Sequence, residues 1–106
     1  MIIPFLRPPA AVIVYLQAPR ERVWGVVRHL DATGIVLQGL DLNSFDDWIR
    51  QVTQGGEGAQ LSTIFFPLIR VEKVLVDAPR EEPHSLAGQF ERRVGRPLLE
   101  FLGIEG

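Results

Sequence analysis

Two apolar segments, residues 12–42 and 61–77, constrain the fold of this chain more than any other feature. The first holds three runs rich in β-branched and aromatic residues, which turn-forming residues at 18–21 and 31–34 separate. The second holds two more runs, and Pro67 separates them because proline interrupts a central strand. Five consecutive strands of this kind predict a small, single-layer β-barrel.

A glycine inside the second predicted strand sets the expected shape of the sheet. Gly25 lies in the middle of residues 22–30, where a glycine marks a bend, a bulge or a close approach of backbones. In the tight turn that follows, Gly34 suits a backbone with positive φ. We therefore predict a strongly bent, open, five-stranded β-barrel.

Two helices are predicted outside the strands. One helix is expected near residues 44–53, with Ser44 as its N-cap. Its apolar residues recur at i, i+3, i+4 and i+7, and they are Phe45, Trp48, Ile49 and Val52. A second helix is expected near residues 85–94, between a Ser85 N-cap and a terminating Gly95. The predicted fold class is therefore mainly β with α (α+β).

Length and composition indicate a single globular domain. The chain has 106 residues, of which 46% are hydrophobic and 23% are charged. We expect one domain over residues 1–106, with the barrel at 12–77, a helical insertion at 43–60 and a C-terminal helical extension at 84–103.

The residue content argues against several classes of function. There is no cysteine, so disulfides, thiolate metal sites and cysteine nucleophiles are excluded. No phosphate loop, metal-ligand cluster or catalytic motif stands in the chain, and we expect no cofactor and no bound metal. No run reaches the roughly 18 apolar residues of a membrane span, so we expect a cytoplasmic protein without a membrane partner.

The second and third predicted strands resemble the Sm-like superfamily of small, strongly bent, five-stranded barrels. Its apolar-x-Gly-x-apolar-x-x-apolar-Asp pattern is matched, at the same spacing, by Val23, Gly25, Val27, Leu30 and Asp31. The resemblance covers residues 12–42 and 61–77. It implies rings in which the fourth and fifth strands of neighbouring copies pair, and it implies RNA as a ligand. The asparagine of the RNA-binding members is replaced here by Thr33 or Gly34, and their Arg-Gly dipeptide is absent.

One candidate contact site lies on the second predicted strand. Trp24 alternates with Arg22 and Arg28, and an aromatic ring between two arginines on one strand face favours base stacking or a partner contact. The alternative for Trp24 is packing in the core. Asp31, at the end of the Sm-like pattern, completes the candidate RNA or partner site.

A second candidate site lies on the fourth and fifth predicted strands. Phe65 and Phe66 are adjacent and must point to opposite faces of their strand, so one can fill the barrel while the other needs a cover. We expect these two residues and the strand 71–76, with Val71 and Val74 as its contact residues, at or near the contact of a homo-oligomer.

Three functions follow from these features. The first is a non-enzymatic barrel that acts through self-association or through interaction with a protein partner. The alternative is an Sm-like RNA-binding protein, which the net charge of −2 disfavours because RNA affinity depends mainly on cations that neutralise phosphates. The third is an enzyme, for which a pairing of Asp31 with His29 is the candidate site.

Overall fold

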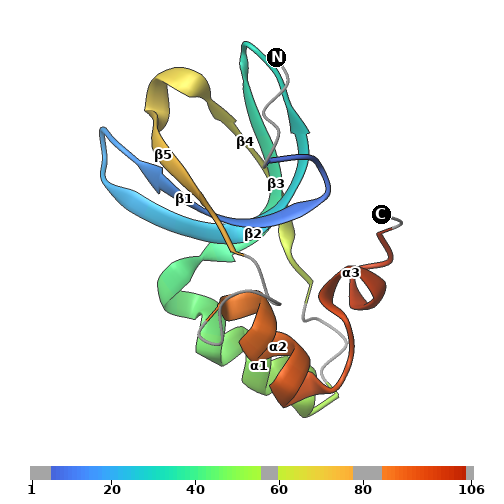
Figure 1. Cartoon of the computed structure of the whole chain (residues 1–106). Coiled ribbons are helices and arrows are strands. Elements are labelled where there is room, and N and C mark those ends of the chain that lie inside the picture. The colour runs from blue at the N-terminus through green and yellow to red at the C-terminus, as the bar shows by residue number, and fades with distance from the viewer. Residues whose placement is uncertain (1–5, 56–59, 78–84, 105–106) are drawn as a thin grey trace.

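The computed structural model describes residues 6–55, 60–77 and 85–104, and it combines one curved sheet with a small group of helices (Figure 1). The strands are β1 (Ala10–Leu16), β2 (Glu21–Leu30), β3 (Gly34–Asp41), β4 (Ser62–Pro67) and β5 (Val71–Val76). The helices are α1 (Phe45–Thr53), α2 (Leu86–Val94) and α3 (Leu98–Phe101), with 3₁₀ turns η1 (Leu42–Ser44) and η2 (Leu68–Arg70). The α+β class and the five strands are confirmed.

The five strands form one antiparallel sheet in the order β4-β3-β2-β1-β5. β4 and β5 are therefore the two edges, although only the short turn η2 separates them along the chain. The sheet curls strongly but does not close on itself (Figure 1). Among the described strands, each edge strand has a neighbour on one side only.

The two faces of the sheet carry two separate apolar cores. Side chains on the inner face, which the curled sheet surrounds, form a core without help from the helices. This inner core consists of Leu6, Val12, Val14, Leu16, Val23, Val27, Ile35, Leu37 and Phe66. On the outer face, Trp24 and Val26 pack against residues of α1, α2 and α3. The helices thus cover the middle of the outer face (Figure 1).

Glycines stand where backbones approach too closely for a side chain, and Gly25 and Gly34 are two of them. A Cβ added to Gly25 would lie 2.4 Å from the carbonyl oxygen of Gln38, which explains why glycine is required at the predicted bend. A Cβ added to Gly34 would lie 2.4 Å from the carbonyl oxygen of Phe66 and 2.6 Å from the Phe65 ring. The expected positive φ at Gly34 is wrong, because lack of space and not backbone conformation selects this glycine.

The helix ends agree with the sequence only in part. The Ser85 hydroxyl accepts a hydrogen bond from the Gly88 amide at 3.0 Å, and α2 ends at Gly95 with φ 82°, so both predicted caps are confirmed. Ser44 precedes α1, but its side chain makes no capping hydrogen bond. The preceding turn η1 is capped by Asp41, whose carboxylate accepts from the Asn43 amide at 2.8 Å. Among the described helices, none is long and apolar enough to cross a membrane.

Candidate interaction surface at the sheet edges

The structure separates the residues of the candidate site on β2. Arg22 and Arg28 are exposed, whereas Trp24 is fully buried between the sheet and the helices. The Trp24 ring meets Phe45 edge-on at a centroid distance of 5.0 Å and lies 5.6 Å from the Trp48 ring. The prediction that Trp24 presents an accessible stacking face is wrong, because the inserted helix α1 covers that face. Contact of Arg22 or Arg28 with RNA or a partner stays a prediction.

The indole of Trp24 also makes a buried polar contact. Its Nε1–H donates to the Asp77 carboxylate at 3.0 Å. The same carboxylate accepts from the amides of Leu86 and Ala87 at 2.9 and 2.7 Å. Asp77 therefore joins the outer face of the sheet to the first turn of α2, which is a structural role.

Asp31 organises the turn between β2 and β3. Its Oδ1 accepts hydrogen bonds from the Thr33 amide at 2.8 Å, the Thr33 hydroxyl at 2.6 Å and the Gly34 amide at 3.3 Å. Its Oδ2 lies 2.9 Å from His29 Nε2. The Thr33 hydroxyl is the main cause that holds the pKa of Asp31 well below its usual range, followed by the Thr33 amide and His29. This geometry is that of a carboxylate that stabilises a turn.

Arg28 has a local partner on the sheet. It lies at an irregularity of the β2–β3 pairing, between Val27 and His29. Its guanidinium donates a hydrogen bond to the side-chain carbonyl of Gln38. Arg22 pairs with Tyr15 in the register of β1 and β2. The two arginines thus lie on β2 on either side of the part that the helices cover.

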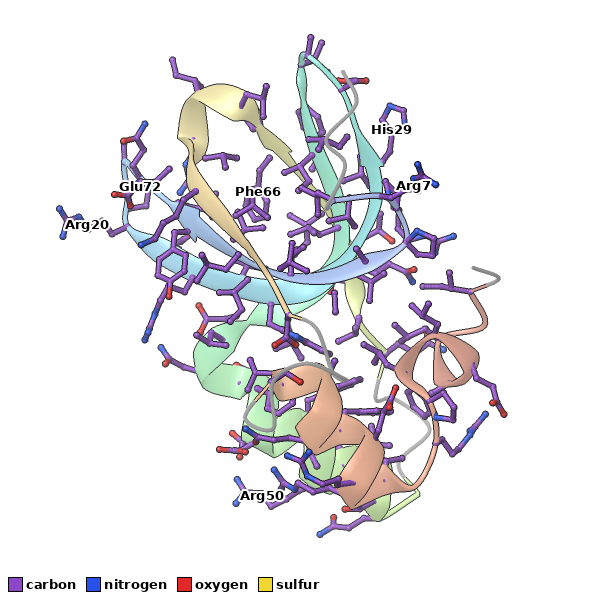
Figure 2. The ribbon with its side chains drawn as sticks, viewed as in Figure 1. Arg7, Arg20, His29, Arg50, Phe66 and Glu72 are labelled. Atoms are coloured by element: carbon purple, nitrogen blue, oxygen red, sulfur yellow. The ribbon has the colours of Figure 1, made fainter. Side chains whose placement is uncertain are left out.

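The second candidate site lies where the sequence places it, and its two phenylalanines point to opposite faces as predicted. Phe66 belongs to the inner core and is 8% exposed (Figure 2). Phe65 belongs to the outer face, where it is 53% exposed and its ring lies against Gly34. Val71 and Val74 of β5 are half-buried and pack against the inner core.

The exposed apolar residues of β5 lie in the strand expected at the contact, although sequence reasoning named only Val71 and Val74 individually. Leu75 is 44% exposed and pairs with Ile13, so it lies on the outer face, and the neighbouring Val76 is 48% exposed. Successive residues of a strand point to opposite faces, so the sequence indicates that Leu75 and Val74 lie on different faces of β5. Only the pairing of β5 with β1 shows which of the two faces is turned to the inner core.

A groove runs along the outer face beside β5. It has a volume of about 660 Å³ and lies between β5 and the first turns of α1 and α2. Its apolar lining includes Ile13, Leu42, Phe45 and Leu75. The polar residues Asp46, Asp77, Ser85 and Gln89 complete the lining, so the hollow beside β5 is of mixed polarity.

No family model, curated protein or solved structure matches this chain. Its function is therefore inferred from its own surface, charges and sheet edges.

Proposed function

We propose that this chain acts by binding and not by catalysis, and that it binds further copies of itself through the two edges of its sheet. The observation that carries the proposal is the pair of open six-residue strands, β4 and β5, at opposite ends of one curled sheet. Within the described part of the chain, no strand pairs with the outer side of either, which leaves backbone N–H and C=O groups there for another strand. Each also has a large exposed apolar side chain, Phe65 on β4 and Leu75 on β5.

The composition of the edges supports pairing with another strand. Soluble proteins commonly protect an edge with charged residues, with proline or with a bulge. β4 contains no charged residue, and its proline stands at its last position. The charges of β5, Glu72 and Lys73, stand near its start. Residues 74–76 of β5 follow these charges, and residues 62–66 of β4 precede Pro67. Neither stretch has such protection, so pairing with another strand is a favourable way to cover its backbone groups.

Kinship with the Sm-like superfamily is part of the proposal. The pattern that carries the resemblance includes Gly25, and this glycine stands where β2 and β3 approach closely, as a strongly bent strand requires. The resemblance implies association through the fourth and fifth strands, and these are the two edges of this sheet.

RNA binding is the second candidate, and the residue chemistry supports it less. The turn between β2 and β3 and the turn η2 lie side by side, since the Leu68 amide donates to the Thr33 carbonyl at 3.1 Å. The exposed side chains of η2 include Leu68 and Ile69, which is 83% exposed. Apolar side chains neutralise no phosphates, so this end of the sheet does not favour RNA.

Solution mass as a function of protein concentration tests the proposal. We expect light scattering to give a multiple of the chain mass, and we expect Phe65→Ser to lower it. Ile69→Ser is the matched control, because it removes an equally apolar and more exposed side chain outside the strands. A wild-type protein that stays monomeric up to its solubility limit would contradict the proposal.

A further inference from the structure

We infer that a pocket between the start of β1 and the helices α2 and α3, the α2–α3 pocket, binds a small apolar molecule that carries a primary ammonium group, and that Glu91 recognises the ammonium. This inference goes beyond the proposed self-association, because it concerns a small ligand and a side chain on α2 that belongs to neither edge strand.

The α2–α3 pocket has the size and the walls of a small-molecule site. Its volume is about 430 Å³, within the range of roughly 300–1,000 Å³ that is usual for such sites. Small side chains leave this space open, since Ala11 of β1 and Ala87 of α2 stand in its wall. Leu98 and Leu99 of α3 form another part of the wall. The apolar body of a ligand would therefore lose its contact with water there.

The charged side chains in the described lining are both carboxylates, Asp77 and Glu91. Asp77 accepts three hydrogen bonds, from the Trp24 indole and from two amides of α2, so its oxygens are already engaged. Glu91 is half-buried, and its Oε2 accepts from the Leu98 amide at 3.3 Å. Among the described residues, no donor reaches the other oxygen of the Glu91 carboxylate. That oxygen is the acceptor which the pocket offers to a ligand.

Basic side chains near Glu91 have other partners. Arg93 pairs with Asp46 at 2.9 Å, and the Arg96 guanidinium lies 5.4 Å from the centre of the Phe101 ring. Within the described part of the chain, no ion pair includes Glu91. A carboxylate that is partly removed from water is stabilised by a cation that donates a hydrogen bond to it. A positively charged ligand is therefore favoured over a neutral or an anionic one of the same shape.

The lining also distinguishes between kinds of cation. Aromatic rings are the usual partners of quaternary ammonium groups, and none of the described residues that line the α2–α3 pocket is aromatic. A carboxylate instead accepts hydrogen bonds from N–H groups, and a primary ammonium has three of them. A primary amine can therefore pair with Glu91 while its apolar body lies against Ala11 and Leu99.

Three probes with the same apolar body test this inference on the wild-type protein. They are cyclohexylmethylamine, cyclohexylmethanol and the trimethylated quaternary form of the amine. NMR titration of the Ala11 and Ala87 amide signals at neutral pH measures the Kd of each probe. We expect the amine to bind about tenfold more tightly than either of the other two, because it alone has both a positive charge and N–H donors.

A substitution of Glu91 tests the residue that is assigned to the ammonium. Glu91→Gln keeps the size of the side chain and an oxygen for the Leu98 amide, but it removes the charge. We expect it to weaken amine binding about tenfold and to leave the affinity for the alcohol unchanged. Glu100→Gln, at an exposed position of α3, is the matched control and should leave both affinities unchanged.

Several outcomes would overturn the inference. These are no binding of the amine, binding no tighter than that of the alcohol, equal amine affinity of the wild type and Glu91→Gln, and signal shifts confined to residues outside the pocket. The comparison of probes needs no variant, so it decides the question even where Glu91→Gln does not fold. The solution mass tests the proposed self-association separately, and a monomeric wild type would leave this inference standing.

Discussion

At the scale of single residues, Asp77 connects the two layers of the molecule. It follows β5 directly, is only 7% exposed, and accepts hydrogen bonds from Trp24 on β2 and from two amides of the first turn of α2. A carboxylate at the N-terminus of a helix also interacts favourably with the helix dipole. The Asp77 side chain therefore binds both the Trp24 indole in the outer core and the start of α2, the helix that packs over that core.

We predict that Asp77→Ala lowers the free energy of unfolding by about 2–4 kcal/mol, because it leaves buried donors without an acceptor. Urea denaturation followed by tryptophan fluorescence measures this loss. Asp47→Ala is the control, since Asp47 lies on the exposed face of α1 and forms a surface ion pair with Arg50. Equal losses for the two variants would show that Asp77 does not have this role.

At the scale of elements, the curl of β2 and β3 depends on a pair of glycines. Gly25 pairs with Gly39 across the two strands. A Cβ on Gly39 would lie 2.5 Å from the carbonyl oxygen of Trp24, so neither position has room for a side chain. The two strands can therefore approach closely at the point where the sheet bends, and this approach brings its two edges toward the same side of the molecule (Figure 1).

We predict that Gly25→Val destabilises the protein by about 2 kcal/mol or more, since its Cβ would meet the Gln38 carbonyl oxygen and a β-branched side chain cannot avoid that contact. Thermal unfolding followed by circular dichroism provides the measurement. Thr63→Val, on the exposed outer face of β4, introduces the same side chain where space is free and serves as the control. An unchanged melting temperature for Gly25→Val would contradict the close approach.

At the scale of the whole molecule, charge distinguishes the two proposed modes of binding. The chain has 11 basic and 13 acidic residues. RNA affinity comes mainly from basic side chains that neutralise phosphates and release their counterions, and this chain has no excess of such side chains. Among the residues of the two edge strands, β4 has no charged residue and residues 74–76 of β5 are uncharged. Association through these edges would depend on backbone hydrogen bonds and buried apolar surface, and salt screens neither of these strongly.

We therefore predict that the solution mass stays constant between about 50 and 500 mM salt, and that short single-stranded RNAs bind weakly throughout this range. Light scattering and a fluorescence titration with labelled RNA provide the two readouts. Tight RNA binding that falls steeply with salt would reverse the order of the two functions.

The sequence by itself determined the elements of this protein and the local reasons for them. The alternation of side chains along a strand placed Phe65 and Phe66 on opposite faces. Apolar residues at i, i+3, i+4 and i+7 predicted α1, and the caps Ser85 and Gly95 predicted the two ends of α2. These features depend on neighbours along the chain, so local patterns are sufficient to predict them.

Only the tertiary structure decided which surfaces remain free. Trp24 and Phe65 are both aromatic residues on the outer face of a strand, yet α1 and α2 bury the first and leave the second half exposed. Asp77 shows no local sign of its role, because its partners lie 53 residues before it and 9 and 10 residues after it. Exposure depends on which distant segments pack over a face, and the periodicity of a single strand contains no information about that cover.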